Sequence, residues 1–379
     1  MNLIVDENIA CASDAFSSLG NTQLVDGRKL SNADLKEADI LIVRSITNVN
    51  EELLQDTNIK FVGTATIGTD HIDIKYLKEN DIHFADSKGC NADSVAEYVF
   101  TALLKVASTN KISLKEKSIG VVGIGNIGSR VVRIAEALGM KVLKNDPPLK
   151  RIGVGNNYVD LEEALNTDII TLHVPMTYEG PDKTYHLLNE ENLKKIKNGA
   201  IIINTSRGAV VDNTALFDNS DKKHFDLVLD VWENEPTVNN ELLLKTKIAT
   251  PHIAGYSFEG KVNGTKMIYN ALCKFLHKEP VWNPSLQKIE TNEMSMPSGK
   301  SDEEKLYKLF SSIYNIEKDD GLMRQIINLE QKNQPAYFDS MRKNYPVRRE
   351  FSNYTVRLTQ TELHLKSFLE TIGFKVKVV

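Results

Sequence analysis

Three glycines in the stretch GVVGIGNIGSR, Gly123, Gly125 and Gly128, have the GxGxxG spacing of a turn that binds a dinucleotide. The first two lack a Cβ atom, so a pyrophosphate can approach the backbone, and the third allows close packing of the following helix. The start of that helix, at Asn126 and Ile127, presents N–H groups and a partial positive charge to the phosphates. The pattern therefore predicts a nucleotide-binding turn.

An aspartate, Asp146, lies at the end of the next predicted strand, MKVLKND. A carboxylate at this position accepts hydrogen bonds from the adenosine ribose and repels the 2′-phosphate of NADP. Without the glycines upstream, a solvated aspartate at a strand end would be the simpler interpretation. With them, the sequence predicts that the cofactor is NAD.

A guanidinium, carboxylates and an imidazole follow three later apolar runs. Arg207 follows IIINTS, Asp230 and Glu235 lie in LVLDVWENEP, and His252 follows IATP. Because the carboxyl ends of parallel strands lie at one edge of a sheet, we expect these side chains to converge beside the nicotinamide. An imidazole next to a carboxylate can remove and return a proton, and a guanidinium matches a substrate carboxylate. Each residue alone is also compatible with an ion pair, a structural histidine or an acidic loop, but the set suits oxidation of a 2-hydroxy acid.

The elements that must position these residues are βα units. Short apolar runs alternate with helix-capable segments in residues 1–90 and again from residue 118, where the runs are rich in β-branched residues and dense enough to be buried on both faces. This rhythm predicts an α/β protein with two doubly wound parallel-sheet domains. A long helix over CNADSVAEYVFTALLKVAST is predicted to carry the chain from the first domain into the second.

Three domains are expected from these patterns. A substrate-binding domain combines residues 1–92 and 254–285, an NAD-binding domain spans 93–253, and a small C-terminal α/β domain spans 286–379. The polar stretch after residue 285 is predicted to be a linker or surface excursion. We expect the substrate to bind in a cleft between the first two domains.

Composition narrows the classes of partner. The 379 residues carry a net charge of −5, which argues against nucleic-acid binding. The N-terminus has no signal-peptide pattern and no stretch is apolar enough to span a membrane, so a cytoplasmic protein is expected. Three widely spaced cysteines predict neither a disulfide framework nor a zinc site. The motif DHID, with His71, is interpreted as a helix cap, and no metal is assigned.

The glycine pattern with Asp146, then NTSRGAVVD, LDVWENEP and TPHIAG in this order, resembles the D-isomer-specific 2-hydroxyacid dehydrogenase family. The resemblance implies a Rossmann NAD domain inserted into a flavodoxin-like substrate domain. It also implies that His252 takes the proton of the substrate hydroxyl, that Glu235 orients His252, and that Arg207 grips the carboxylate.

Further roles are implied by the same resemblance. Asp230 is expected to hold the nicotinamide carboxamide, and Gly255 to lie near the cofactor. Relatives often carry threonine at the position of Val174, so a contact of Val174 with the cofactor is expected to be made by its backbone or its apolar side chain. Stretches such as VRSITNVN, FVGTATIGTDHID and HIAGYSFEGK resemble one branch of the family that acts on a small phosphorylated hydroxy acid and forms a homodimer through the C-terminal domain. The substrate-contacting positions of that branch match Ser45, Thr66 and Tyr256.

Two alternatives stay open at this point. The chain could oxidise another 2-hydroxy acid, or it could be a non-catalytic module that senses NAD. The basic cluster Arg342, Lys343, Arg348 and Arg349 is interpreted as solvated or intersubunit, with contact to a substrate phosphate as the alternative.

Overall fold

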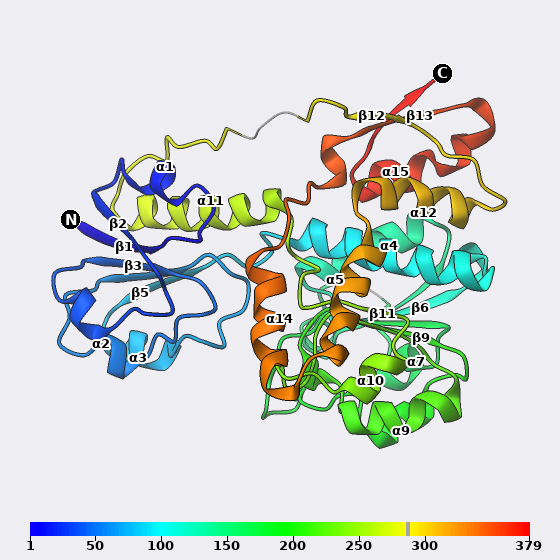
Figure 1. Ribbon diagram of the computed structural model, residues 1–379, viewed down its shortest axis with the longest axis horizontal. Helices are drawn as coiled ribbons and strands as arrows, with labels where there is room; N and C mark the ends of the chain where they lie inside the picture. Colours follow the sequence, from blue (N-terminus) through cyan, green and yellow to red (C-terminus); the bar gives the residue numbers. More distant parts are fainter. Residues whose placement is uncertain (156, 286–288) are drawn as a thin grey trace. The chain divides into compact units, whose positions relative to one another are not determined.

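The computed structural model describes residues 1–155, 157–285 and 289–379. The chain divides into two compact units, one made of Met1–Asn91 with Ser257–Lys288 and the other of Ala92–Tyr256 with Ile289–Val379. Each unit is built from parallel sheets with helices on their faces (Figure 1). The predicted α/β fold class is therefore confirmed. Among the described residues, no helix combines the length and the apolarity that crossing a bilayer requires.

The first unit contains a five-stranded parallel sheet in the order β2-β1-β3-β4-β5. Alternate residues of each strand point to opposite faces. Leu3 and Val5 pack against the helices α1 and α11, while Ile4 packs on the other face with Leu35, Leu54 and Leu77. The strands are β1 (Asn2–Asp6), β2 (Asn21–Val25), β3 (Ile40–Val43), β4 (Phe61–Thr64) and β5 (His83–Asp86). The helices are α1 (Ala12–Phe16), η1 (Asn32–Leu35), α2 (Glu51–Leu54), α3 (Ile74–Glu79) and α11 (Phe258–Phe275).

The second unit contains a six-stranded parallel sheet in the order β11-β10-β9-β8-β6-β7. The chain runs outward from β6 to β7 and then crosses back to β8, so the strand order switches between β6 and β8, where open α/β sheets bind their ligands. The strands are β6 (Ser118–Val122), β7 (Lys141–Asn145), β8 (Ile169–Leu172), β9 (Ile201–Asn204), β10 (Asp226–Leu229) and β11 (Ile248–Ala249).

Helices cover both faces of this sheet, as the apolar runs predicted. Ile119 and Val121 share a core with α4 and α5, whereas Val122, Ile170 and Leu172 share a core with the helices on the other face. The helices are α4 (Ala92–Asn110), η2 (Leu114–Glu116), α5 (Asn126–Ala137), α6 (Pro147–Arg151), α7 (Leu161–Leu165), α8 (Glu190–Lys195), η3 (Gly208–Val210), α9 (Asn213–Lys223) and α10 (Asn240–Lys245).

The C-terminal segment forms a three-stranded parallel sheet in the order β12-β13-β14. Its first strand lies in the stretch that the sequence predicted to be a linker. The prediction missed this strand because three largely exposed residues are too short a pattern to recognise, and only their pairing with β13 makes them a strand. The strands are β12 (Glu293–Ser295), β13 (Thr355–Leu358) and β14 (Lys375–Val378). The helices are α12 (Asp302–Ile313), α13 (Ile316–Arg324), η4 (Gln325–Asn328), η5 (Gln331–Asn333), α14 (Gln334–Lys343), η6 (Phe351–Asn353), η7 (Gln360–Leu365) and α15 (Lys366–Ile372).

This C-terminal segment shares its hydrophobic core with the six-stranded sheet. Phe310 and Phe368 belong to the same buried cluster as α4 and α5, and the ring of Phe368 meets that of Phe100 in α4 edge-on, with centroids 6.0 Å apart. On the other side of the sheet, Phe338 of α14 belongs to the second buried cluster. The segment therefore packs against both layers of helices, and its removal would expose apolar surface of the second unit.

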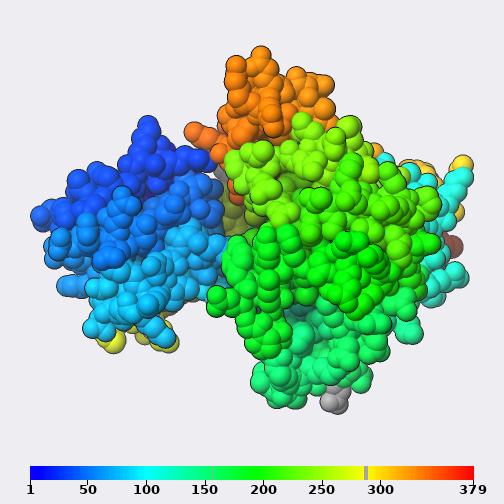
Figure 2. Space-filling model, turned by 90° about the horizontal axis from the view of Figure 1, so that it is seen from below, coloured from blue at the N-terminus to red at the C-terminus, as the bar shows by residue number. Residues whose placement is uncertain are grey.

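Helix α13 attaches to the edge of the sheet by polar contacts as well. Arg324 donates hydrogen bonds to the carbonyls of Thr246 at 2.6 Å and Leu243 at 3.3 Å, at the end of α10. Figure 2 shows the orange surface of the segment that contains α13 and α14 lying directly against the yellow-green surface of this part of the chain. The bond to Thr246 satisfies a carbonyl just past the end of α10, and the carbonyl of Leu243 accepts from Arg324 in addition to the N–H of Thr246.

Asp168 supports a prediction about acid stability. Its carboxylate accepts hydrogen bonds from the N–H and the hydroxyl of Ser118, at 2.8 and 2.6 Å, and from Lys197 at 3.1 Å. Burial raises the pKa of Asp168, but these bonds outweigh it and lower the pKa to about 2. Because an unfolded aspartate titrates near about 4, the stabilisation is complete above that pH and is lost as the pH falls towards about 2.

We therefore expect the free energy of unfolding to fall more steeply between about pH 4 and pH 2 in the wild type than in Asp168→Asn. Since a third of the side chain is exposed, solvent screening limits the difference to about 1 kcal/mol. Urea titrations of both proteins across this window measure it. Parallel slopes would contradict the role of Asp168.

Candidate active site

The residues predicted to do chemistry lie past the carboxyl ends of β9, β10 and β11. Leu229 pairs with Asn204 on one side and with Ala249 on the other, so the three strands end in register. Arg207, Asp230 and His252 follow these ends along the chain. The sheet therefore brings them to one edge of the second unit, as the sequence predicted.

Asp230 is buried, with 1% of its surface exposed, and its carboxylate accepts hydrogen bonds from the turn that carries His252. Oδ1 accepts from the N–H of Ile253 at 2.8 Å and from the hydroxyl of Thr250 at 2.6 Å, and Oδ2 accepts from the N–H of Ala254 at 2.9 Å. The backbone N–H of His252 donates to the carbonyl of Asp230 at 2.7 Å. Asp230 thus fixes the conformation of residues 250–254, a structural role that the sequence did not reveal.

His252 and Glu235 form a hydrogen-bonded pair. Nδ1 of His252 lies 2.5 Å from Oε1 of Glu235, and Oε2 of Glu235 accepts from the N–H of Trp232 at 3.2 Å. Burial raises the pKa of Glu235, but His252, Arg342 and the N–H of Trp232 lower it more, so the pKa lies below its ordinary value. The carboxylate is therefore ionised at neutral pH and holds the imidazole at Nδ1. This bond leaves Nε2 as the ring nitrogen that does not contact Glu235.

The residue after Arg207, Gly208, packs against the loop that carries Glu235. A Cβ atom on Gly208 would lie 2.0 Å from the carbonyl carbon of Trp232 and 2.4 Å from the nitrogen of Glu233, so only glycine permits this packing. The side-chain amide of Asn204 donates to the carbonyl of Arg207 at 2.9 Å. The arginine loop therefore packs directly against the loop that carries Glu235. Arg207 itself is half-buried, and its Nη1 donates to the carbonyl of Ser206 at 2.8 Å.

The glycine-rich turn has the geometry that a dinucleotide requires. A Cβ atom on Gly128 would lie 1.9 Å from the carbonyl oxygen of Gly123, so α5 packs closely on the end of β6. Gly125 is the N-cap of α5 and, together with Asn126, is exposed. An uncovered helix N-terminus next to a turn with two glycines fits the pyrophosphate of NAD. Ile127, in the same first turn, is half-buried.

Asp146 and Val174 border this turn. Oδ2 of Asp146 accepts from the N–H of Ile124 at 2.8 Å, and Oδ1 accepts from the N–H of Leu149 at 3.0 Å as the N-cap of α6. A Cβ atom on Gly123 would lie 2.9 Å from Cγ1 of Val174, which places that side chain against the turn. Asp146 therefore holds the glycine turn in place, in addition to lying where an adenosine ribose is expected.

Two substrate-contacting candidates lie in the first unit. Ser45 is exposed and follows β3, and Thr66 follows β4, whose end pairs with the end of β3. The hydroxyl of Thr66 lies 2.9 Å from that of Thr64, which lies 3.0 Å from Nε2 of His71. The polar groups form a hydroxyl–imidazole chain at the carboxyl edge of this sheet. The helix cap at DHID is Asp73, which accepts from the N–H of Tyr76.

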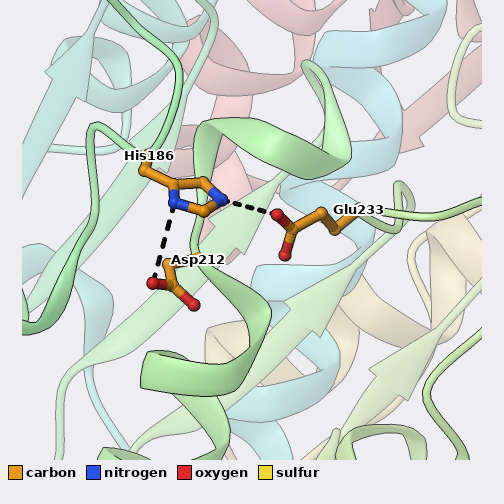
Figure 3. Close-up of side chains that lie close together, drawn as sticks. All are labelled: His186, Asp212 and Glu233. Atoms are coloured by element: carbon orange, nitrogen blue, oxygen red, sulfur yellow. Dashed lines mark hydrogen bonds and ion pairs between the residues drawn. The ribbon is translucent and has the colours of Figure 1, made fainter.

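A second histidine–carboxylate cluster joins His186, Asp212 and Glu233 (Figure 3). Nε2 of His186 lies 2.5 Å from Oε1 of Glu233, Nδ1 lies 3.7 Å from Oδ2 of Asp212, and the other oxygen of Glu233 accepts from the N–H of Asn213 at 3.0 Å. The three groups are near enough to hold a metal ion, but Nε2 of His186 is already hydrogen-bonded to Glu233. We interpret the cluster as a clamp on the loop that carries Glu235.

Two arginines of the basic cluster lie beside the turn that carries His252, which the sequence did not indicate. Arg348 has 5% of its surface exposed, and Nη2 donates to the carbonyls of Ala254 at 2.6 Å and Ser94 at 3.1 Å. The interpretation of Arg348 as a solvated residue is therefore wrong. Arg342 lies over the ring of Tyr256, with Cζ 5.9 Å from the centroid. The local sequence RKNYPVRRE does not indicate which of its arginines are buried, because the partners of these arginines are distant in the sequence.

Comparison with known proteins agrees with this geometry. Residues 93–254 match the NAD-binding domain of D-isomer specific 2-hydroxyacid dehydrogenases, and residues 285–373 match a domain of unknown function, DUF3410. An erythronate-4-phosphate dehydrogenase of Psychromonas ingrahamii is 43% identical over 100% of this chain and 97% of that protein. One of Shigella dysenteriae is 45% identical over 94% of each chain.

Solved structures show the same likeness. A D-lactate dehydrogenase of Aquifex aeolicus, complexed with NAD and lactic acid, is 28% identical with a TM-score of 0.58 and matches 73% of this chain and 96% of its own. The NAD cofactor predicted from the glycine turn is confirmed by these relationships. The chain therefore belongs to the D-isomer specific 2-hydroxyacid dehydrogenase family, and it is an NAD-dependent dehydrogenase.

Proposed function

We propose that the protein oxidises 4-phospho-D-erythronate at C2 to (R)-3-hydroxy-2-oxo-4-phosphooxybutanoate with NAD, a step of pyridoxal 5′-phosphate biosynthesis. The observation that carries the chemistry is the hydrogen bond between His252 and Glu235 at the edge of the NAD-binding sheet. The substrate is supported by the near full-length similarity to proteins named erythronate-4-phosphate dehydrogenase.

In this proposal, Nε2 of His252 takes the proton of the C2 hydroxyl as the carbonyl forms. Glu235 accepts the hydrogen bond from Nδ1, fixes the orientation of the ring and stabilises the imidazolium that results. NAD supplies the chemistry of accepting the hydride from C2. His252 returns the proton when the reaction runs in reverse.

Arg207 is proposed to bind the substrate carboxylate and the developing carbonyl, because its planar guanidinium can donate two parallel hydrogen bonds to one carboxylate. Ser45, Thr66 and Tyr256 are proposed to contact the rest of the substrate. Their hydroxyl groups can donate to the oxygen atoms of a phosphorylated hydroxy acid.

The cofactor is proposed to bind along the turn at the switch in strand order. Its pyrophosphate would lie against the first turn of α5, its ribose against Asp146, and its nicotinamide half near the catalytic turn. The pyrophosphate residues are Gly123, Gly125, Asn126, Ile127 and Gly128, and those on the nicotinamide side are Val174, Asp230 and Gly255.

We also propose a cytoplasmic homodimer, assembled through the C-terminal segment, with a substrate-binding domain formed by residues 1–92 and 254–285 and an NAD-binding domain formed by residues 93–253. The family resemblance supports this organisation. The mass of the full-length protein in solution tests the dimer, and a monomer at micromolar concentration would oppose it.

The substrate proposal predicts the outcome of a comparison between two phosphorylated acids. We expect kcat/KM, measured as NADH formation, to be highest for 4-phosphoerythronate and at least about ten-fold lower for 3-phosphoglycerate, because one phosphate-to-carboxylate spacing fits the site better. A higher kcat/KM for 3-phosphoglycerate would show that 4-phosphoerythronate is not the preferred substrate. No NADH with any hydroxy acid in a panel would favour a non-catalytic NAD-binding module.

Replacement of His252 tests the acid–base role. We expect His252→Ala to lower kcat by roughly two to four orders of magnitude, because the general base is lost, while NAD affinity changes little. NADH formation and a fluorescence titration with NADH measure the two effects. His364→Ala, which removes an exposed imidazole in η7, is the control and should behave as wild type. Near-normal turnover of His252→Ala would end the assignment.

Asp146 predicts the choice between the two nicotinamide cofactors. We expect Asp146→Ser to raise the ratio of kcat/KM with NADP to that with NAD by roughly ten-fold, because the negative charge that repels the 2′-phosphate is removed. Serine keeps the N-cap of α6. Asp146→Asn, which removes the charge and keeps the shape, should change the ratio in the same direction. An unchanged ratio in both variants would refute the role.

A further inference from the structure

The C-terminal segment places a cation next to the catalytic turn. Arg342 is near the end of α14, and its guanidinium lies over the ring of Tyr256, 5.9 Å from the centroid. The ring of Tyr345 packs edge-on against the same ring, at 5.7 Å between centroids. Tyr256 follows His252 along the turn, so Arg342 reaches the site from a domain for which the family comparison records no function.

The position of Arg342 is fixed by neighbours on both sides. Phe338, one turn earlier in α14, is fully buried in the core below the sheet. Tyr345 donates from its hydroxyl to Asp319 at 2.7 Å, and Arg348 donates to the carbonyl of Ala254 at 2.6 Å. The segment that carries Arg342 is therefore tied to the turn of His252 and to the core.

Burial of this guanidinium requires a compensating anion. Nε of Arg342 is buried and makes no hydrogen bond within the described residues. Burial lowers the pKa of Arg342, but Tyr256 and Glu235 raise it above its ordinary value. The effect is mutual, because Arg342 is among the groups that lower the pKa of Glu235. The charges of His252, from the turn, and of Arg342, from α14, thus both favour the ionised form of Glu235.

We propose that Arg342 is a positioning residue for the catalytic pair: a cation supplied by the C-terminal segment that keeps Glu235 ionised as the hydrogen-bond partner of His252. The other groups that act on the pair are the N–H of Trp232 on Glu235 and the carboxylate of Asp339 on Arg342. The inference rests on the proposed role of His252 as the base.

The charge of Arg342 has a defined effect on proton transfer. A positive charge near the pair opposes the uptake of a further proton by the pair. It also keeps Glu235 an acceptor, which holds the proton on Nδ1 and the lone pair on Nε2. Without Arg342, the pair should bind a proton at higher pH and be inactive as a base over a wider range.

The test is the pH profile of kcat/KM for Arg342→Met, Arg342→Lys and Lys343→Met. The first variant removes the charge and keeps the length, the second keeps the charge, and the third removes a charge from an exposed neighbour in the same helix. We expect the acid limb of Arg342→Met to move up by roughly one pH unit, with an activity loss of about ten-fold below the limb and recovery above it. Arg342→Lys should restore most of the shift, and Lys343→Met should match the wild type.

Other outcomes would overturn the proposal. A uniform loss at every pH, with the limb unmoved, would make Arg342 only structural. A loss confined to 4-phosphoerythronate, with the rate on unphosphorylated erythronate unchanged, would make it a phosphate ligand. Thermal unfolding and NADH binding of each variant show whether it is folded, and Arg342→Lys decides the question if Arg342→Met is not. If the wild type forms no NADH from any acid, the proposed function fails; an active wild type with unshifted variants refutes only the role of Arg342.

Discussion

The buried carboxylate of Asp230 fixes the turn that carries His252, on which the proposed catalytic pair depends. Its oxygen atoms accept from the hydroxyl of Thr250 and from the N–H groups of Ile253 and Ala254, and its own carbonyl accepts from the N–H of His252. His252 has a φ of 56°, a left-handed conformation that is costly for a residue other than glycine. Charge-assisted hydrogen bonds to a buried carboxylate are strong enough to hold such a backbone. The backbone conformation at His252 is therefore set by Asp230, which lies outside the proposed pair of His252 and Glu235.

The same turn is also held from the side of α4. The hydroxyl of Ser94 donates to the carbonyl of Ala254 at 3.0 Å, and Arg348 donates to the same oxygen. The hydroxyl of Tyr98 lies 2.7 Å from that of Thr250 and so continues the chain of polar contacts outward from the carboxylate. A carbonyl with two donors and a carboxylate with three leave the backbone of the turn few alternative arrangements. The helix that starts the second unit and the C-terminal segment thus share in supporting the site.

Sequence patterns predicted the features that are local in the chain. The glycine spacing at 123–128 dictates a turn whatever surrounds it, and residues such as Arg207 and His252 follow buried strands whose ends must meet at one edge of a parallel sheet. What the patterns could not predict are partners distant in the sequence. Arg348 contacts a carbonyl at Ala254, and nothing in its neighbourhood distinguishes it from the exposed Lys343.

Very short strands and side chains with two roles could not be predicted from the sequence either. Strand β12 has three residues, and only its pairing with β13 makes it a strand. The carboxylate of Asp146 was expected to meet a ribose, but that it also accepts from the N–H of Ile124 depends on how the glycine turn folds back on the end of β7. Such dual roles follow from tertiary packing, which side-chain type and spacing do not determine.

The common core of α4 and the C-terminal segment restricts how this architecture could arise. Phe100 and Tyr98 of α4 meet Phe368 and Tyr314 of the later segment, so each partner covers aromatic surface of the other. A dehydrogenase that gained or lost this segment would have to exchange the residues on that face of α4 in the same lineage. If the segment were grafted onto a relative that lacks it, its aromatic rings would meet a helix face made of polar residues. The two surfaces would not pack together, and the aromatic rings of the segment would remain exposed to solvent.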